Sequence, residues 1–538
     1  MLWPRVSGAI CGPTGDQAAK FQQTGGAVVR FHGEAKRDAY DVIVVGAGMG
    51  GLTVAALLAR LGRSVLVVER HDRVGGYAHA FRRGRFLFDS AVHLVGGCER
   101  GPFEGSGMID ELLSALEVKD HCEFERVDPC YEAVYPDFAV RAPCDLEEFV
   151  EAHAEKFPGE KKGLRQFLQE CLGARQETRR AAELASPYDV IKSPDRFPTL
   201  LRYRKATLSQ VLDANIESER LRSALGSLWP YLGLPPSRVS FLYFATMLMS
   251  YIADGAYYCK GSFQRLADAL ASAIRARGGE ILLRSSVRRI RVEGGRVRGI
   301  SLENGQLIAA PLVISNADAT QTVEELVGEA AFPRRYIEDL HGRKFSLSAF
   351  VTYIAADVPL EKQGTCHETF FFPSTDHDEA FRGSASGDPS WFSVTVPTLA
   401  DPGLAPEGTH LLVLTTLVPH RVGRGWRAEK ERMTERMLDL AEERLGGLRA
   451  RIRHIESGTP RTMERYTRNS AGAIYGWELS PEQVGPARLG LRTPVEGLQL
   501  VGHWTQPGGG IYGVVSSGIQ AARAALDLPS EAELWRSL

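Results

Sequence analysis

DVIVVGAGMGGLTVAALLARLGRSVLVVER, residues 41–70, contains a complete strand, loop, helix and strand pattern. An apolar β-branched run, Val42–Val45, leads into a glycine-rich loop, which a helix of small residues and a second apolar run follow. Gly46, Gly48 and Gly51 give the loop the spacing G-x-G-x-x-G. At this spacing the first glycine allows a tight turn, the second lets a pyrophosphate approach the backbone, and the third lets helix and strand pack closely.

The residues around this loop predict a nucleotide ligand. The helix that begins near Met49 would point its free N–H groups and the positive end of its dipole at the phosphates. Glu69 ends the second apolar run about 20 residues after the loop, where a carboxylate can accept both hydroxyls of a ribose and disfavours a 2′-phosphate. We therefore expect a dinucleotide-binding βαβ unit; the alternative is a glycine-rich turn without a ligand.

The next segment distinguishes FAD from NAD. Residues 70–76 read RHDRVGG, and the glycine pair resembles the second signature of the glutathione-reductase-like flavoproteins, especially of their amine-oxidase and phytoene-desaturase branch. In that family this loop runs beside the FAD pyrophosphate, whereas NAD dehydrogenases do not need it. The resemblance implies FAD as the cofactor, with contacts from Arg70, Gly75, Gly76, Tyr77 and Val287.

A second signature lies near the C-terminus. Residues 498–526 read LQLVGHWTQPGGGIYGVVSSGIQAARAAL: a strand, a glycine loop and a small-residue helix. No strand follows to carry a ribose-binding acid, so we expect the helix N-terminus to stabilise negative charge on the flavin ring instead. The residues expected at the cofactor are Gly502, His503, Gly510, Gly513 and Val514; in the family the residue after Gly502 is often an acid, and here it is His503.

Composition sets few limits. The 538 residues suffice for two domains with large cores, and 44% hydrophobic and 24% charged residues are ordinary for a globular protein. A net charge of -2 gives no reason to propose nucleic acid. The eight cysteines show neither C-x-x-C nor a metal spacing, so we expect reduced thiols, no metal site and a cytoplasmic protein.

No segment predicts a transmembrane helix or a signal peptide. The apolar run Phe241–Ile252 is too short to span a bilayer, and residues 1–39 lack the apolar core of a signal peptide. We expect residues 1–39 to be a disordered N-terminal extension or a misassigned start. Residues 151–206 mix basic side chains with Phe and Leu, which suits peripheral membrane binding, although an ordinary solvated helical face is the alternative.

Strand and helix patterns divide the chain into two domains. The FAD-binding domain is expected from residues 40–110, 256–320 and 495–530, and the substrate domain from 111–255 and 321–494. The middle FAD stretch predicts a helix over 263–277, strands over 281–283, 287–292 and 297–302, a hairpin turn at Gly294-Gly295, and a strand from Leu312. In the substrate domain, Leu164–Leu172 fits an amphipathic helix, and 348–354, 391–397 and 410–418 read as strands.

Several further stretches resemble one family of flavoproteins. Residues 257–305, which begin YYCKGSFQRLADALASAIRARGG, together with 313–319 (VISNADA) and 397–408 (PTLADPGLAPEG), resemble bacterial phytoene-desaturase-related proteins, and 459–476 (TPRTMERYTRNSAGAIYG) resembles carotenoid isomerases. The family includes phytoene desaturases, carotenoid cis–trans isomerases and retinol saturases, which are FAD proteins acting on conjugated polyenes. The resemblance implies an α/β fold: a glutathione-reductase-like Rossmann FAD-binding domain with an inserted α+β substrate domain.

The branch within the family stays open. The pattern from Gly75 to Gly96, including His93, most resembles retinol saturase, and Tyr77 stands where desaturases usually have Arg. Ala91 departs from the glycine that is common to all branches. Pro507-Gly-Gly-Gly resembles desaturases more.

The expected chemistry needs little from side chains. FAD takes or gives hydride at N5, while the protein supplies an apolar tunnel, orientation and exclusion of water. His93, His503 and Tyr512 are the catalytic candidates beside the ring; His93 could donate a proton near neutral pH, and the alternative is a structural histidine. For Trp504 and Tyr512 we expect packing rather than chemistry. Phe370–Phe372 and Phe241–Met249 are candidates for the tunnel wall, with core packing as the alternative.

Together these features predict an FAD-dependent oxidoreductase that desaturates or saturates carbon–carbon bonds of a polyene or isoprenoid lipid. We expect it to take its substrate from a membrane surface, peripherally, and to use an external electron donor or acceptor. The alternatives are a redox-neutral carotenoid isomerase using reduced FAD, a flavin amine oxidase, which would need a polar substrate anchor, and a non-enzymatic protein like the GDP-dissociation inhibitors.

Overall fold

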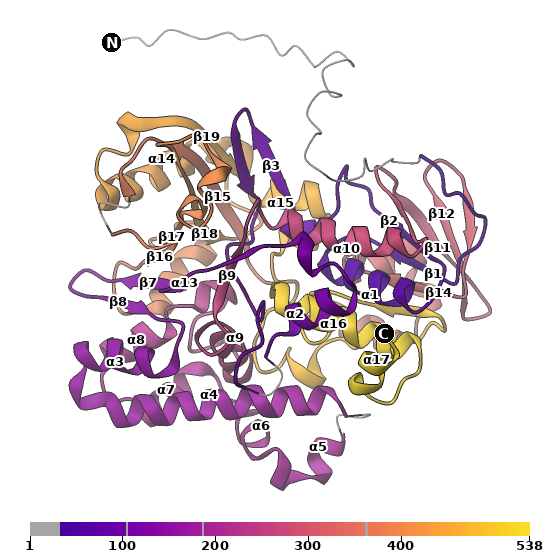
Figure 1. The fold of residues 1–538 in the computed structure, drawn as a ribbon, viewed down its shortest axis with the longest axis horizontal. Coiled ribbons are helices and arrows are strands. Elements are labelled where there is room, and N and C mark those ends of the chain that lie inside the picture. Colours follow the sequence, from indigo (N-terminus) through magenta and orange to yellow (C-terminus); the bar gives the residue numbers. More distant parts are fainter. Residues whose placement is uncertain (1–32, 104–105, 185–187, 361–363) are drawn as a thin grey trace.

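A five-stranded parallel sheet forms one half of the molecule. The computed structural model describes residues 33–103, 106–184, 188–360 and 364–538 (Figure 1). The sheet has the order β10-β2-β1-β14-β20, and each neighbouring pair is parallel. Its strands are β1 (Val42–Val45), β2 (Val65–Val68), β10 (Glu280–Leu282), β14 (Leu312–Ser315) and β20 (Leu498–Leu500). Continuous runs of Val, Ile and Leu suit such strands because both faces of the sheet are covered.

The two faces of β1 and β2 pack against different partners. Val44 and Val67 face a core shared with α1 (Met49–Arg60), α10 (Gln264–Ala276) and α16 (Gly510–Ala525). Ile43 and Leu66 face a second core that includes residues of the antiparallel sheet β11 (Val287–Glu293), β12 (Arg296–Leu302) and β13 (Leu307–Ala309). This alternation with a period of two residues is the geometry of a strand buried on both sides.

The other half contains a seven-stranded mixed sheet of order β19-β15-β18-β17-β16-β7-β8. Its strands are β7 (Tyr131–Val134), β8 (Ala139–Ala142), β15 (Ser348–Ala356), β16 (Glu368–Phe371), β17 (Phe392–Thr395), β18 (His410–Val418) and β19 (Ile452–Gly458). One face packs against α14 (Trp426–Leu445) through side chains such as Phe350 and Met437. In Figure 1 a group of helices, drawn in purple, lies at the lower end of this half.

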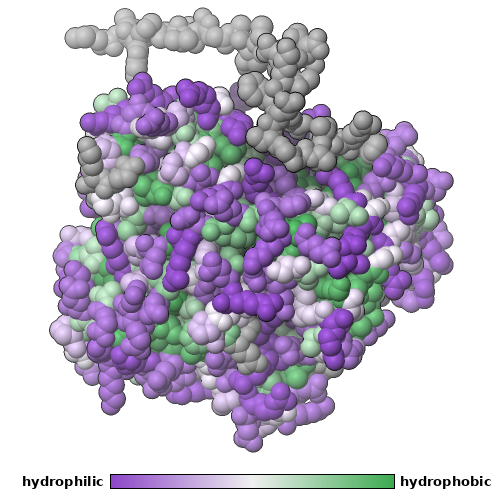
Figure 2. Space-filling model, in the orientation of Figure 1, coloured by the Kyte–Doolittle hydropathy of each residue, from purple (hydrophilic) through white to green (hydrophobic). Residues whose placement is uncertain are grey.

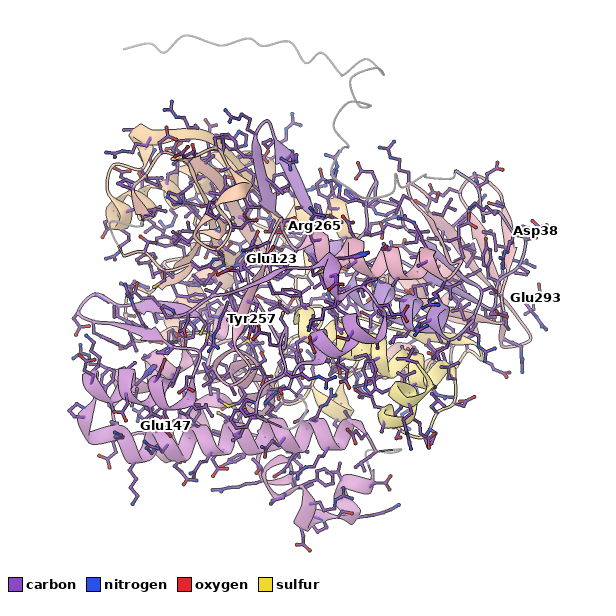
Figure 3. All side chains as sticks on the ribbon, in the orientation of Figure 1. Asp38, Glu123, Glu147, Tyr257, Arg265 and Glu293 are labelled. Atoms are coloured by element: carbon purple, nitrogen blue, oxygen red, sulfur yellow. The ribbon has the colours of Figure 1, made fainter. Side chains whose placement is uncertain are left out.

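That helical group is built around α4 (Lys161–Ala182), which packs against α9 (Phe241–Ile252). Arg165 of α4 donates to both carboxylate oxygens of Glu147 on α3 (Leu146–Lys156), at 2.9 and 2.6 Å (Glu147 is labelled in Figure 3). The other helices of the group are α5 (Tyr188–Lys192), α6 (Pro198–Tyr203), α7 (Leu208–Asn215) and α8 (Glu219–Gly226).

Short elements join the two halves. The remaining strands are β3 (Ala80–Arg83), β4 (Phe86–Asp89), β5 (Val95–Gly96), β6 (Phe124–Arg126) and β9 (Ala256–Cys259). The remaining helices are α2 (Met108–Ala115), α11 (Ala319–Gln321), α12 (Arg334–His341), α13 (His377–Ser386), α15 (Pro460–Thr467) and α17 (Glu531–Ser537). Among the described residues, no helix is both long enough and apolar enough to cross a membrane.

Most local expectations are confirmed, with small shifts at the ends. The helix expected over 263–277 is α10, the hairpin at Gly294-Gly295 joins β11 and β12, and the strands expected over 348–354, 391–397 and 410–418 are β15, β17 and β18. The helix expected at Leu164–Leu172 is part of α4. Val323, Leu326 and Leu340, which lie beyond the domain boundary predicted at residue 320, pack in the core of the five-stranded sheet.

The prediction of a disordered N-terminal extension over residues 1–39 is wrong in part. Residues 1–32 lie outside the described residues, but residues 33–39, expected to be disordered, are ordered against the sheet. The backbone N–H of Ala35 donates to Gln306 at 2.9 Å, and Ala39 forms a β-bridge with Ala309. The hydroxyl of Tyr40 donates to the Glu280 carboxylate at 2.6 Å. The order of residues 33–39 could not be predicted from the sequence because the residues that they contact lie far away in the chain.

The close packing of α1 on α16 gives the first prediction. A Cβ at Gly518 would lie 2.6 Å from Thr53 Cβ and 2.8 Å from the carbonyl oxygen of Gly50, so Gly518→Val should force the two helices apart. We expect a loss of about 1–3 kcal/mol in the free energy of unfolding, measured by urea denaturation. Gly423→Val is the control, because a Cβ there would meet nothing within 4 Å. Equal stability of the two variants would contradict the packing described.

Candidate functional site

One large cavity, of about 1120 Å³, connects the two halves of the molecule. At one end it is lined by Gly46, Glu69 and Asn316, which follow the carboxyl ends of β1, β2 and β14. At the other end it reaches Phe370 on β16 and Thr415 on β18. Ligands of open parallel sheets bind outside the carboxyl ends of the strands, where neighbouring connections run to opposite sides, and β1 and β14 form such a point.

The glycines of the first loop meet the requirements that their spacing predicted. Gly46 has φ +95, a conformation that favours glycine. A Cβ at Gly51 would lie 2.3 Å from the carbonyl oxygen of Gly46, so this residue serves packing and does not line the cavity. Gly48 and Met49 do line it. Gly46, Gly48 and Gly50 therefore expose backbone to the cavity at the N-terminus of α1, which is the form of a phosphate cradle.

The second glycine pair lies directly beside this loop. Gly75 has φ +117 and forms a β-bridge with Gly48, and a Cβ at Gly76 would lie 3.1 Å from Gly48 Cα. The two glycine signatures, separated in the sequence, thus form one surface of the cavity. This arrangement fits a pyrophosphate between them.

Glu69 is held at the cavity by the backbone. Its Oε2 accepts the N–H of Ala47 at 2.8 Å, and its Oε1 accepts the N–H of His71 at 2.7 Å. Each carboxylate oxygen keeps a second lone pair for another donor. The residue is therefore oriented as a ribose acceptor requires.

Asn316 is a site residue that the sequence interpretation missed. It follows β14 and lines the cavity, and its side chain lies within 4 Å of the Cβ positions of Gly46, Gly48, Gly50, Gly51 and Gly502. Gly502 does not line the cavity; with φ +96, and with a Cβ position 2.6 Å from Asn316 Oδ1, it leaves room for the amide. The available signal was a polar residue at the carboxyl end of an apolar strand.

The other predicted cofactor residues lie around the same cavity. Arg70, Tyr77, Val287, His503, Gly510, Gly513 and Val514 all line it. The Arg70 guanidinium donates to the carbonyl of Arg465, and burial raises the pKa of Tyr77, whose hydroxyl lies 3.3 Å from the carbonyl oxygen of Ala473. Because α16 begins at Gly510, the N-termini of α1 and α16 both face the cavity. Cofactor contact by these residues stays a prediction.

The three catalytic candidates line the cavity in different environments. His93 Nδ1 lies 2.9 Å from Thr395 Oγ1 and 3.3 Å from Glu368 Oε2. Burial, and then the Arg488 charge, lower the pKa of His503 to about 3, so its ring is neutral at pH 7. Burial raises the pKa of Tyr512. His93 is therefore the candidate whose ring contacts both a hydroxyl and a carboxylate.

Trp504 is a packing residue, as expected. It is 2% exposed and does not line the cavity, and its Nε1 donates at 3.1 Å to Oδ1 of Asn469, a residue that does line it.

The wall between these ends is apolar and aromatic. One face of α9 contributes Leu242, Tyr243, Thr246, Met247, Ser250 and Tyr251, a spacing that places side chains on one side of a helix. Phe370 lines the cavity, whereas Phe372 packs against His377 with ring centroids 4.6 Å apart. The aromatic run 370–372 is thus divided between wall and core.

The cavity reaches the surface beside α5 and α6. Ile191 both lines the cavity and is 66% exposed, which places an opening there. Leu200, Leu201, Arg204 and Lys205 line the same end.

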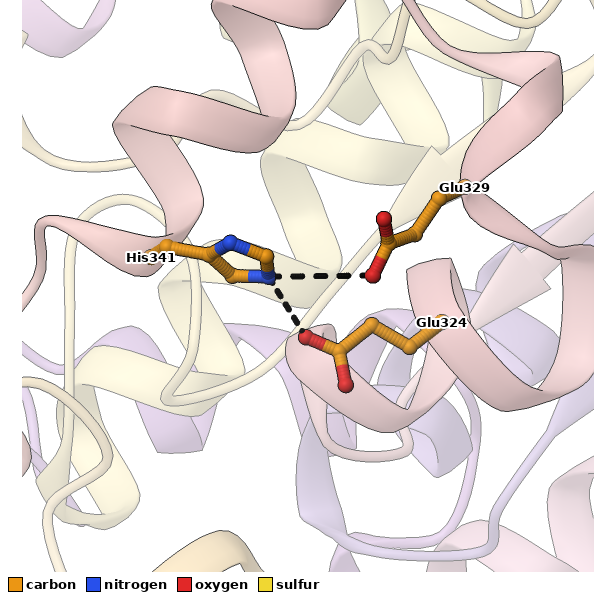
Figure 4. A group of neighbouring side chains, drawn as sticks. All are labelled: Glu324, Glu329 and His341. Carbon is orange, nitrogen blue, oxygen red and sulfur yellow. Dashed lines mark hydrogen bonds and ion pairs between the residues drawn. The ribbon is translucent and has the colours of Figure 1, made fainter.

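Glu324, Glu329 and His341 form a separate cluster with the spacing of metal ligands (Figure 4). His341 Nε2 lies 2.8 Å from Glu324 Oε1 and 3.9 Å from Glu329 Oε1. All three side chains are exposed, so an ordinary surface ion pair accounts for their proximity.

Comparison with known proteins adds a family to this geometry. A model of the family described as flavin containing amine oxidoreductases matches residues 49–526. The chain is 28% identical over 530 residues to the phytoene desaturase (neurosporene-forming) of Cereibacter sphaeroides, covering 91% of this chain and 96% of that protein. It is 28% identical over 553 residues to the chloroplastic prolycopene isomerase 1 of an Oncidium hybrid cultivar, covering 98% and 91%.

Two more proteins extend the comparison. The all-trans-retinol 13,14-reductase of Danio rerio is 26% identical over 509 residues, covering 86% of this chain and 82% of that protein. The structure of cyclohexylamine oxidase from Brevibacterium oxydans aligns with a TM-score of 0.58 at 19% identity, covering 92% and 99%. At this identity, the similarity to cyclohexylamine oxidase concerns the fold alone.

The glycine cradle gives the second prediction. In Gly48→Val the Cβ would lie 2.5 Å from Asn316 Nδ2, and the branched side chain would fill space that backbone alone now borders. We expect the purified variant to contain little or no flavin, measured as flavin absorbance per polypeptide. Gly159→Val is the control, since nothing lies within 4 Å of its Cβ position. Full flavin content in Gly48→Val would show that the cofactor lies elsewhere.

Proposed function

Because this chain belongs to the family of flavin containing amine oxidoreductases, we propose that it is an FAD-dependent oxidoreductase acting on carbon–carbon bonds of a polyene or isoprenoid lipid. The observation that carries the proposal is the continuity of the cavity, which runs from the paired glycine loops to a wall of apolar and aromatic side chains. One end suits a dinucleotide and the other suits an extended apolar substrate.

The residues at the first end fit FAD. The paired glycine loops leave room for the pyrophosphate, Glu69 is oriented to accept ribose hydroxyls, and α16 directs its N-terminus into the cavity. When bound, the flavin accepts or donates a hydride at N5. The protein's part is to hold the substrate against it and to exclude water, which the buried, apolar wall does.

The substrate class follows from the wall and from the relatives. The relatives named above are a desaturase, an isomerase and a reductase of polyenes, and the aromatic and aliphatic side chains of α9 and β16 suit such molecules. An amine substrate fits less well. Among the described residues that line the cavity, Glu69 is the one carboxylate, and it lies at the nucleotide end.

Product analysis tests the proposal. Holoprotein, oxidised or reduced, is incubated with phytoene, prolycopene or all-trans-retinol, and the products are resolved by chromatography and mass. A change of two hydrogens in one of them supports the proposal, and an external electron donor or acceptor then completes the cycle. An isomer of unchanged mass favours the redox-neutral alternative. Oxidation of an amine without any polyene turnover, or a protein without flavin, would contradict it.

Glu69 gives a prediction for FAD affinity. Glu69→Ala removes the ribose acceptor and the acceptor of two backbone N–H groups, which costs on the order of 1.5–3 kcal/mol. We expect FAD affinity to fall roughly 10- to 100-fold, measured by titration of the apoprotein with FAD. Glu69→Gln, which keeps an acceptor oxygen, should lose less. Unchanged affinity in Glu69→Ala would mean that the carboxylate does not contact FAD.

We further propose that the opening beside α5 and α6 docks on a membrane. Hydrophilic side chains cover most of the face seen in Figure 2, whereas Ile191 at the opening is 66% exposed. Arg196, Arg204 and Lys205 are exposed around it. Apolar insertion with basic residues nearby is the pattern of an anionic lipid surface, and a lipid substrate could pass directly into the cavity.

Charge reversal tests this docking. The triple change of Arg196, Arg204 and Lys205 to Glu should lower binding to anionic liposomes. Turnover of liposome-borne substrate should fall by a larger factor than turnover of detergent-dispersed substrate, on which Arg204 and Lys205 act only as residues of the cavity lining. The control reverses Arg421, Arg424 and Arg427, exposed residues at the start of α14, which lies at the opposite end of the molecule in Figure 1. Wild-type binding should weaken as salt rises. Failure of wild-type protein to co-sediment with anionic liposomes at low salt would refute membrane docking.

A further inference from the structure

A buried carboxylate lies directly behind His93. Glu368, the first residue of β16, has a side chain that is 0% exposed, and its Oε2 lies 3.3 Å from His93 Nδ1. Thr395, its cross-strand partner on β17, donates to the same Oε2 at 2.6 Å, and Thr395 Oγ1 lies 2.9 Å from His93 Nδ1. Two oxygen atoms therefore face one nitrogen of the imidazole.

These contacts fix the tautomer of the ring. Because the Thr395 hydroxyl proton points to Glu368, the Thr395 oxygen is an acceptor toward His93, and so is the carboxylate. The proton of a neutral ring then resides on Nδ1. Nε2 carries the free lone pair and lies on the opposite side of a ring that lines the cavity.

Sheet packing does not account for Glu368. Its second oxygen, Oε1, is buried and accepts no hydrogen bond of normal geometry from the described residues, although the Tyr231 hydroxyl lies close enough to interact with the carboxylate. Burying a charged group with an unsatisfied oxygen is costly, so stability alone would favour an uncharged side chain at this position. A buried carboxylate is expected where an adjacent cation must be stabilised.

The other ionisable groups nearby are neutral or engaged elsewhere. Burial lowers the pKa of His367, which contacts the His93 carbonyl oxygen at 3.1 Å, to about 4. Burial raises the pKa of Asp89 to about 6, and its carboxylate accepts the N–H of Phe263 at 2.9 Å. Burial, followed by the Glu368 charge, raises the pKa of Tyr231. Two more tyrosines with pKa values raised mainly by burial and also by Glu368 are Tyr251 and Tyr475. Asp89 also interacts with His93 through its charge, but Glu368 is the carboxylate in direct contact with the ring.

We propose that Glu368 is a positioning residue that, with Thr395, holds His93 so that its Nε2 exchanges the proton at one carbon of the reacting bond. This inference rests on the proposed oxidoreductase function. In desaturation, bound flavin would supply the hydride acceptor for one carbon. The adjacent carbon loses a proton to Nε2, and the electron pair of that C–H bond forms the new double bond. Saturation is the reverse, with the proton supplied by the imidazolium. This division of labour matches buried carboxylates that orient and stabilise a catalytic imidazole.

Four variants test the proposal. His93→Gln removes the proton-exchanging group, and kcat should fall about 10²- to 10⁴-fold. Glu368→Gln keeps the shape and loses the charge, and kcat should fall by at least about 10-fold with KM little changed, because the apolar wall still binds substrate. Thr395→Val should give a smaller loss. Glu132→Gln is the matched control: Glu132 lies on β7, next to β16, and pairs with Arg141 at 3.0 Å.

A spectroscopic measurement accompanies the kinetics. Nitrogen NMR of histidine-labelled holoprotein, with the His93 signals assigned by their loss in His93→Gln, reports which ring nitrogen carries the proton. We expect the Nδ1-protonated form in the wild type and a change in its population in Glu368→Gln. Flavin content and unfolding midpoints of all variants confirm that they are folded.

The outcomes separate the two proposals. An Nε2-protonated ring in the wild type, or an unchanged kcat in Glu368→Gln, overturns the role of Glu368. Absence of polyene turnover by the wild type overturns the proposed function, and the NMR result then still decides whether Glu368 holds His93 as described. An Nδ1-protonated ring, together with kcat losses in the His93, Glu368 and Thr395 variants and none in Glu132→Gln, supports the inference.

Discussion

The site depends on the close approach of backbone to backbone around the side chain of Asn316. Segments that are distant in the sequence converge there, and a Cβ at Gly50 would lie 3.0 Å from Asn316 Oδ1 and 3.1 Å from Gly502 Cα. Only residues without side chains allow α1, the Gly75-Gly76 loop and the C-terminal loop to meet at this distance. The same lack of side chains leaves the phosphate end of the cavity open. The glycines around Asn316 therefore allow both the packing of these segments and the space for the ligand, and a substitution at one of them affects both.

The rest of the site follows from this convergence. With α1 and α16 packed side by side, their N-termini face one cavity, and the strand that precedes α16 becomes the edge of the five-stranded sheet. The seven-stranded sheet and α9 close the far end with aromatic and aliphatic side chains. Within that wall, His93 contacts Thr395 and is backed by the buried Glu368 carboxylate.

Local sequence patterns predicted the parts of the site that depend on backbone geometry. Three such features are the glycine spacings, the acid after β2 and the alternation of buried faces along β1. Each reflects a constraint within a short stretch of chain, so each could be predicted without a structure. Asn316, Glu368 and Thr395 were not, because their roles come from contacts between strands far apart in the chain. The ordered segment 33–39 was missed for the same reason. His93 could be predicted as a catalytic candidate. The tautomer of its ring could not, because it depends on Glu368 and Thr395, which lie more than 270 residues further along the chain.

The most direct test of the account is an anaerobic single turnover of the FAD-loaded protein with a polyene. The oxidised protein and the reduced protein are each mixed with substrate, and flavin absorbance and extracted product are measured together. If the protein transfers hydride as proposed, in one direction one flavin changes its redox state for each substrate molecule that gains or loses two hydrogens. Flavin that keeps its redox state in both directions, with the polyene unchanged in mass, would contradict it.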